Sequence, residues 1–210
     1  MNTLQEILAP LPLVAILRGV IPAEVTGIGE LVLEAGFVAI EVPLNSPEPL
    51  ESIRLLAKAH GERALIGAGT VRDPADVQRI ADAGGRLIVM PHSDGAVIHA
   101  AKQRGLFCVP GVATPTEAFA ALASGADALK LFPAEALPPA VVKAWRAVLP
   151  AGHWLLPVGG ISARTMAPYL AAGANGFGLG SALYKAGMTP AQVAANARSF
   201  VDAYATLVRS

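Results

Sequence analysis

The chain has 210 residues, of which 53% are hydrophobic and only 15% are charged, and its formal net charge is zero. This length allows one large hydrophobic core but leaves little material for a second, so we expect a single domain over residues 1–210. The balanced charge and the lack of a basic run argue against nucleic acid as a partner.

No apolar stretch reaches the ~18–20 uninterrupted residues that a membrane span requires, so we expect no membrane partner. The N-terminal segment Met1–Glu6 lacks the basic region of a signal peptide, and Cys108 is the only cysteine, so no intrachain disulfide can form. These features predict a soluble, cytoplasmic protein. Charged residues are sparse against the typical ~25%, which predicts that other copies of the chain cover part of the surface.

Short apolar runs recur along the chain, and after the first one each follows a glycine. The runs are Leu13–Leu17, Val38–Val42, Ala64–Ala68, Leu87–Met90, Phe107–Val109, Ala128–Phe132, Leu155–Val158 and Gly176–Leu179. The preceding glycines are Gly36, Gly61, Gly84, Gly105, Gly125, Gly152 and Gly173. Glycine suits the left-handed position that ends a helix, and continuous apolar runs are typical of strands buried on both faces of a parallel sheet.

The segments between these runs have helical spacing and begin with residues that favour helix N-termini. These starts are Pro22–Glu24, Ser46–Glu48, Asp73–Asp76, Thr114–Glu117 and Ser162–Thr165. A last helix is expected over roughly Pro190–Val208. Eight strand–helix units in one domain predict a (β/α)8 TIM barrel. An open doubly wound sheet would usually bring a G-x-G-x-x-G loop after the first strand, and this strand instead ends in Leu17-Arg-Gly19.

In such barrels the active site lies at the C-terminal ends of the strands. Lys130 lies in the sixth predicted strand and shares a face with Ala128 and Phe132. Burial lowers the pKa of a lysine, and a neutral amine is a nucleophile toward carbonyl groups. Alternatively, the side chain reaches solvent at the strand end or forms a structural ion pair.

Glu41 is the second charged residue within an apolar run, on the same face as Ala39. Its strand is the second and that of Lys130 is the sixth, so the two lie opposite each other in a ring of eight. Side chains of alternate strands share one interior layer, so Glu41 and Lys130 can meet near the barrel axis. They can form a buried salt bridge there, or a catalytic pair.

The seventh and eighth strands both end in glycine-rich loops. The first loop contains Val158, Gly159 and Gly160, and the second contains Gly180 and Ser181. Loops in these positions frequently bind phosphate through backbone N–H groups and a short extra helix, for which Ala182–Lys185 is suited. Ordinary tight turns are the alternative for either loop alone.

Other strand ends offer polar groups but no cluster of metal ligands. Arg18 supplies a cation suited to a carboxylate or phosphate, and Thr70 supplies a hydroxyl. His92 and the other histidines do not cluster with carboxylates, so we expect no catalytic metal and no cofactor. Cys108 is interpreted as core packing. Together these groups predict a phosphorylated, carboxylate-bearing substrate that is cleaved at a carbon–carbon bond through an imine.

The same residues resemble a known family. The segments Glu41-Val-Pro-Leu-Asn-Ser-Pro47, Gly67-Ala-Gly-Thr-Val71, Leu129-Lys-Leu-Phe-Pro133, Val158-Gly-Gly-Ile161 and Gly178-Leu-Gly-Ser181 closely resemble the class I 2-keto-3-deoxy-6-phosphosugar-acid aldolases. The gluconate branch of that family typically has an arginine where this chain has Asn45, and a threonine where it has Val158. Both departures are typical of the galactonate branch, which acts on the phosphogalactonate substrate.

The resemblance implies a homotrimeric barrel that acts in galactonate catabolism and releases pyruvate and D-glyceraldehyde 3-phosphate without a metal. It implies that Lys130 forms the Schiff base and that Glu41 moves protons. Arg18 and Thr70 would hold the substrate carboxylate, with Phe132 and Pro91 as walls. Gly160, Gly180 and Ser181 would take the phosphate, and Val158 would lie near the C4 hydroxyl.

Three other functions remain open at this point. The substrate can be the gluconate epimer or 4-hydroxy-2-oxoglutarate, because one hydroxyl's configuration is worth only a few kcal/mol in a pocket. A sugar-phosphate isomerase or epimerase would share the phosphate loops but need no amine nucleophile. A non-catalytic sugar-phosphate sensor would bind the ligand without releasing pyruvate.

Overall fold

Parallel β-strands alternate with α-helices along the chain in the computed structural model, which describes residues 2–209. The strands are β1 (Leu13–Ile16), β2 (Ala39–Pro43), β3 (Leu65–Gly69), β4 (Leu87–Val89), β5 (Phe107–Val109), β6 (Gly111–Val112), β7 (Ala128–Leu131), β8 (Trp154–Pro157) and β9 (Phe177–Leu179). The helices are α1 (Leu4–Leu8), α2 (Pro22–Glu34), α3 (Pro49–His60), α4 (Pro74–Asp82), α5 (Gly95–Gln103), α6 (Pro115–Ala123), α7 (Pro139–Arg146), α8 (Met166–Ala171) and α9 (Pro190–Arg209), with a 3₁₀ turn, η1, at Ala134–Ala136.

All eight predicted strands are confirmed within a residue or so at each end, and the predicted C-terminal helix is confirmed as α9. Proline stands at the first helical position of α2, α4 and α6, as expected, because its missing N–H has no intrahelical partner there. Six of the seven predicted helix-ending glycines have a positive φ. Gly61 is the exception, since it ends α3 with a φ of −62°.

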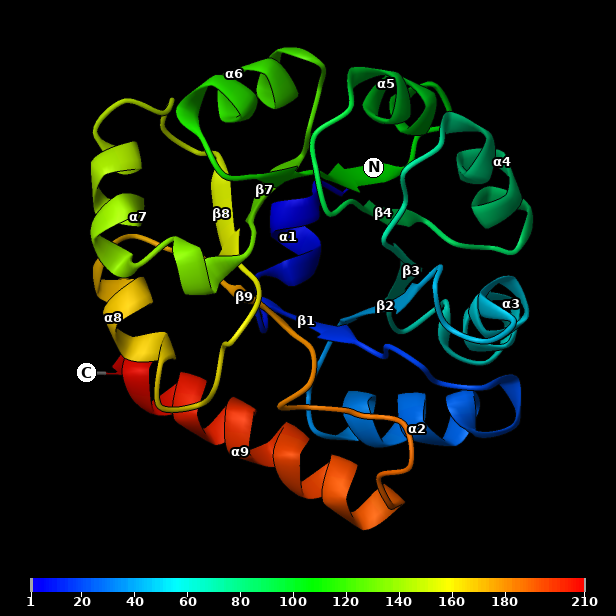
Figure 1. Cartoon of the computed structure of the whole chain (residues 1–210). Helices are drawn as coiled ribbons and strands as arrows, with labels where there is room; N and C mark the ends of the chain where they lie inside the picture. Colours follow the sequence, from blue (N-terminus) through cyan, green and yellow to red (C-terminus); the bar gives the residue numbers. More distant parts are fainter. Residues whose placement is uncertain (1, 210) are drawn as a thin grey trace.

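The strands form two hydrogen-bonded parallel sheets whose edges approach each other. Six strands pair in the order β5-β4-β3-β2-β1-β9, and three pair in the order β6-β7-β8. A parallel bridge between Val158 and Gly178 joins the end of β8 to β9. On the other side, Asp127 N–H donates to Cys108 O at 3.0 Å, and Lys130 N–H donates to Pro110 O at 2.9 Å. The fold is therefore α/β with a curved parallel sheet, around which the helices are arranged in Figure 1.

Alternate residues of the strands face two separate hydrophobic clusters. Outward-facing residues such as Ile40 and Leu129 pack with the helices, whereas inward-facing ones such as Ala39, Ala128 and Leu156 form a smaller inner cluster. The predicted two-sided burial of the strands is thus confirmed. Two consequences follow for the site: side chains on the Ala39 and Ala128 face point inward, and Glu41 and Lys130 are on that face.

Helix α1 was not expected from the sequence, and it covers one end of the inner cluster. Leu4 and Leu8 are each 1% exposed and belong to that cluster. Figure 1 shows α1 in the middle of the ring of strands. A capping box fixes its start, because Thr3 Oγ1 accepts from Glu6 N–H while the Glu6 carboxylate accepts from Thr3 N–H.

The prediction of a short helix after β9 was wrong. The segment Ala182–Lys185 is a turn rather than a short helix, with the N–H groups of Leu183 and Tyr184 both donating to Gly180 O. The fifth predicted strand is continued by β6, which pairs with β7 after the interruption at Pro110. Proline lacks the N–H that a continuous ladder requires, which accounts for that interruption.

Among the described residues, no helix is both long enough and apolar enough to cross a bilayer.

Candidate active site

The structure brings Lys130 and Glu41 to the same buried space inside the ring of strands. Lys130 is on β7 and is 5% exposed, and Glu41 is on β2 and is 2% exposed. Both line a small internal cavity whose remaining lining is mostly apolar and includes Leu4 and Leu8 of α1. The predicted convergence of the two side chains is therefore seen in the structure.

The two charged groups do not form a close ion pair. Within residues 2–209, no lysine–carboxylate contact of 4.0 Å or less joins Lys130 to Glu41, and Glu41 Oε2 has no hydrogen-bond partner. The simple alternative of a structural salt bridge is thus not what the geometry shows. An unpartnered buried carboxylate oxygen is costly in a folded protein, and such groups concentrate at functional sites.

Burial acts in opposite directions on the two pKa values. Loss of hydration raises the pKa of Glu41, while the nearby charges of Lys130 and Arg18 oppose that rise. Loss of hydration lowers the pKa of Lys130, Glu41 opposes this, and the positive charge of Arg18 lowers it further. Both effects favour the uncharged forms, a neutral amine beside a carboxylic acid.

Two neighbours fix the immediate surroundings of this pair. The Lys130 Nζ lies 4.5 Å from the centre of the Phe132 ring, which leaves the amine between an aromatic face and the interior. The Glu41 carboxylate packs directly on the backbone of Gly69 at the end of β3, where an added Cβ would lie 1.5 Å from Oε2. The glycine at position 69 is therefore required by the position of Glu41.

A larger cavity of about 310 Å³ opens from Lys130 toward solvent. Of the predicted site residues, its lining includes Arg18, Lys130, Phe132, Val158, Gly159, Gly160, Gly180 and Ser181. The structure thus brings together residues from the ends of β1, β7, β8 and β9. Thr70 lies beside this cavity, since its Oγ1 is 3.4 Å from Arg18 Nη2. Pro91 is not among the described residues that line either cavity.

The glycine-rich loops present backbone rather than side chains to the cavity. Gly159 and Gly160 have successive positive φ angles of 107° and 64°, which glycine adopts without steric cost because it has no Cβ. An added Cβ at Gly180 would meet nothing within 4 Å, so this position is open to a bound group. The backbone is therefore open to the cavity at Gly180, whereas the Glu135 side chain packs on Gly159 and Gly160.

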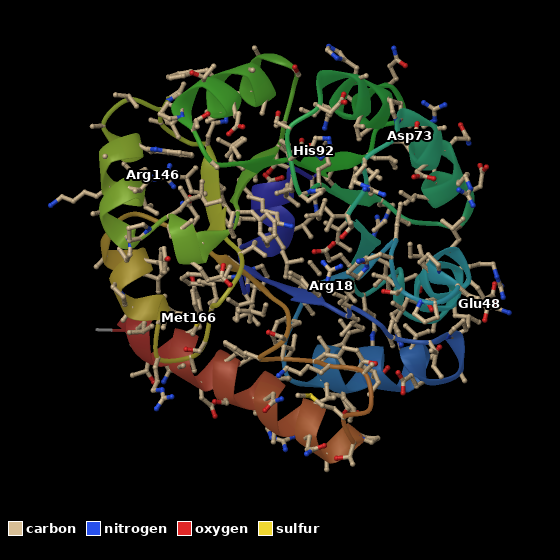
Figure 2. All side chains as sticks on the ribbon, in the orientation of Figure 1. Arg18, Glu48, Asp73, His92, Arg146 and Met166 are labelled. Carbon is tan, nitrogen blue, oxygen red and sulfur yellow. The ribbon has the colours of Figure 1, made fainter. Side chains whose placement is uncertain are left out.

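Arg18 lies at the mouth of the cavity with two polar partners. Its Nη1 donates to Asn45 Oδ1 at 2.5 Å, and its Nη2 to Thr70 Oγ1 at 3.4 Å. Figure 2 shows Arg18 inside the ring of helices, whereas Glu48 at the start of α3 lies at its outer edge. The guanidinium carries no carboxylate partner within the described residues, so its charge is available to a ligand.

Two charged cavity residues were missed at the level of sequence. Glu135 follows the lysine strand, and its carboxylate packs against Gly159 and Gly160, while Lys185 follows the Gly180 loop. Both are exposed, and an exposed charge in a loop carries no sequence signal of a site.

Comparison with known proteins adds a family to this geometry. A family model described as "KDPG and KHG aldolase" matches residues 4–197. The chain is 50% identical over 193 residues to the Rhizobium meliloti (strain 1021) protein "Probable 2-dehydro-3-deoxy-6-phosphogalactonate aldolase", covering 92% of this chain and 91% of the relative. It is 46% identical over 199 residues to the Escherichia coli (strain K12) "2-dehydro-3-deoxy-6-phosphogalactonate aldolase", covering 95% and 97% respectively.

A solved structure described as "Native KDPGal structure" superposes with a TM-score of 0.94. It is 46% identical in sequence, and the match covers 95% of this chain and 97% of that one. The curved parallel sheet and the order of the elements are therefore those of that structure.

Proposed function

The chain belongs to the KDPG and KHG aldolase family, and we propose that it cleaves 2-dehydro-3-deoxy-6-phospho-D-galactonate to pyruvate and D-glyceraldehyde 3-phosphate. It is then a carbon–carbon lyase that works through a Schiff base. The observation that carries this proposal is the pair of buried, unbridged groups, Lys130 and Glu41, which share the small internal cavity, while Lys130 also lines the larger cavity with the glycine-rich loops.

The first half of the reaction makes an electron sink. The neutral Nζ of Lys130 attacks the C2 ketone, and the carbinolamine that forms loses water to give a protonated imine. Glu41 in its acid form donates a proton to the departing hydroxyl, which is a role suited to a carboxyl whose pKa is raised.

The second half breaks the carbon chain. Ionised Glu41 takes the proton of the C4 hydroxyl, directly or through a water, and the C3–C4 bond breaks as the C4 aldehyde forms. The bonding electrons pass through C3 and C2 to the imine nitrogen, which leaves an enamine on Lys130. Protonation at C3 and addition of water then release pyruvate and free the amine.

The two ends of the substrate are held by different groups of residues. Arg18 and Thr70 hold the carboxylate, with Phe132 as a wall. Backbone N–H groups of the Gly159–Gly160 loop and of Gly180, with the Ser181 hydroxyl, hold the phosphate. Val158 lies beside C4, so its apolar side chain is a determinant of which C4 epimer is accepted.

The test is the release of pyruvate from both C4-epimeric 6-phosphosugar acids, measured side by side with lactate dehydrogenase as the coupling enzyme. We expect kcat/KM to be higher for the galactonate epimer. A higher value for the gluconate epimer would assign the chain to the other specificity of the family. Absence of pyruvate from both substrates would contradict the aldolase function.

Further proposals concern architecture and assembly. We propose that the two sheets form one closed (β/α)8 barrel, in which β5 and β6 are one strand interrupted by Pro110. The Val158–Gly178 bridge and the hydrogen bonds between Pro110, Cys108 and the β7 segment support this closure. One domain would then cover residues 1–210, of which Met1 and Ser210 lie outside the described residues.

We also propose that three copies associate and that the enzyme acts in the cytoplasm on a small-molecule sugar acid. The 15% charged composition supports association. Light scattering should give three times the chain mass of 21.5 kDa, and a monomer mass would contradict association.

A further inference from the structure

The chemical steps of the reaction do not explain the contact between Asn45 and Arg18. Asn45 follows β2 and is exposed, yet its Oδ1 accepts from Arg18 Nη1 at 2.5 Å. Arg18 follows β1, so the two residues come from neighbouring strands of the same sheet. The Arg18 side chain would otherwise be free to turn into solvent, because Thr70 at 3.4 Å holds it only weakly.

The loop that carries Asn45 is itself fixed on both sides. Leu44 N–H donates to Gly69 O at 2.8 Å, which ties the loop to the end of β3. The buried Ser46 accepts from Gly19 N–H at 2.9 Å, which ties it to the residue after Arg18. Asn45 lies between these two anchors, so its backbone is held close to the residues that carry Arg18.

The chemistry of an amide suits this position. A neutral acceptor orients the guanidinium without cancelling its charge, whereas a carboxylate would form an ion pair with it and compete with the substrate. Arg18 also acts electrostatically on both Lys130 and Glu41, so its orientation affects the reacting groups as well as the bound carboxylate.

Resting on the proposed function, we infer that Asn45 is a positioning residue that holds Arg18 in the orientation that receives the carboxylate of the 2-keto acid. Asn45 touches no reacting atom in this role, and its effect passes entirely through Arg18. Ser46 supports the same arrangement, because its side-chain Oγ accepts from the Gly19 backbone N–H and so joins the two loops.

A double-mutant cycle of Asn45→Ala and Arg18→Ala tests this inference. Asn45→Ala should raise KM for the phosphosugar acid about tenfold with kcat changed less than about twofold. The reason is that Arg18 loses the hydrogen bond that orients it, and it then binds the substrate carboxylate less tightly in the ground state. In the Arg18→Ala background, Asn45→Ala should change kcat/KM less than about twofold. Pro47→Ala, an exposed change in the same loop, is the matched control and should leave KM unchanged.

Trapping of the imine with cyanoborohydride makes the result independent of carbon–carbon cleavage. Cyanoborohydride trapping of pyruvate should be slowed about tenfold in Asn45→Ala, whereas trapping of methyl pyruvate, which lacks the carboxylate charge, should change less than about twofold. The positioning role is wrong if Asn45→Ala lowers kcat/KM equally in the Arg18→Ala background, or if it slows the trapping of pyruvate and of methyl pyruvate equally. Either result leaves the aldolase function unaffected. Normal trapping of pyruvate without cleavage of the phosphosugar acid would overturn the aldolase function and leave the role of Asn45 standing. If the wild-type protein neither traps pyruvate nor cleaves the phosphosugar acid, the aldolase function and the role of Asn45 are both overturned.

Discussion

Burial makes one lysine and one glutamate chemically unusual within the same cavity. The pKa of Lys130 is lowered and that of Glu41 is raised, mainly because each has lost its hydration. A surface lysine and a surface glutamate would both be charged at neutral pH and would do neither half of the reaction well. The charge of Arg18 modifies the pKa of both residues, but it is a smaller cause than the loss of hydration.

The first prediction concerns the pH dependence of imine formation. The rate of cyanoborohydride trapping with pyruvate should rise with a midpoint below 10.5, the ordinary pKa of a lysine, because only the neutral amine attacks. Arg18→Ala should move this midpoint upward, since a neighbouring positive charge is lost, and Glu41→Gln should move it downward. Measuring trapping rates across pH for the three proteins checks this; an unshifted midpoint in both variants would contradict the assigned electrostatics.

The second prediction separates activity from stability at Glu41. Glu41→Gln should reduce kcat by roughly 10²–10⁴-fold, because a proton carrier is lost. The same change should stabilise the fold at neutral pH. A carboxyl whose folded pKa is raised contributes its full stability below the unfolded value of 4.5, and this contribution is lost as the pH rises through the folded pKa.

Urea unfolding at about pH 4 and about pH 8 measures that difference. The stability gain of Glu41→Gln over the wild type should be small at the lower pH and larger at the higher pH. A gain that shrinks with rising pH would show that folding lowers the pKa of Glu41 instead of raising it.

Lys130 and Glu41 could be predicted from the sequence because a charge inside an apolar strand is rare and must have a reason. Glu135 and Lys185 could not, since charges in loops are ordinary. The contact between Asn45 and Arg18 depends on side-chain directions after two different strands, which the sequence does not contain.

At the scale of elements, the ends of the strands determine what the cavity can bind. The strands themselves were recognisable, because continuous apolar runs separated by helix-ending residues have few other interpretations. The sequence pattern does not predict helix α1, because five residues are too few to show a helical period. Thr3 and Glu6 nevertheless carry a capping-box signal. The turn at Ala182–Lys185 was assigned to a helix by analogy with other barrels, and the backbone there closes only one turn.

The third prediction tests the anion loop after β9. Gly180→Ala should raise KM for the phosphorylated substrate at least about tenfold, because the new methyl group would occupy the space of the phosphate. The melting temperature should not fall, since the added Cβ meets nothing within 4 Å in the free protein. Steady-state kinetics and thermal unfolding measure both quantities.

Gly27→Ala is the matched control for that experiment. Gly27 is exposed in α2, and an added Cβ there also meets nothing within 4 Å. It should leave KM unchanged and slightly raise the melting temperature through helix propensity. An unchanged KM in Gly180→Ala would remove this loop from the phosphate site.

At the scale of the whole molecule, the reactive pair depends on a curved parallel sheet whose interior also holds helix α1. Strands β2 and β7 lie in different hydrogen-bonded sheets, and only the curvature of the fold brings their side chains to one cavity. The sequence predicted this meeting through the rule that alternate strands of a barrel share a layer. It could not predict that α1 would lie in the middle of the strands, as Figure 1 shows, with Leu4 and Leu8 in the inner cluster.

The fourth prediction concerns helix α1. Leu8→Ala should lower the free energy of unfolding by about 2–5 kcal/mol, because a fully buried leucine is replaced by a void. Leu8 also lines the cavity of Lys130, so water entering the void should weaken the desolvation of the amine and raise its pKa. Denaturant unfolding and the pH profile of trapping measure the two effects. A stability loss without any shift of the trapping midpoint would show that α1 supports the fold but not the chemistry.

The central claim is that Lys130 is the amine that forms the imine. It is tested most directly by reducing the protein with borohydride in the presence of pyruvate and locating the added mass by peptide mass spectrometry. The modification should lie on the peptide that contains Lys130 and should be absent from Lys130→Met. A folded protein that carries the adduct on another lysine, or carries none, would contradict the claim.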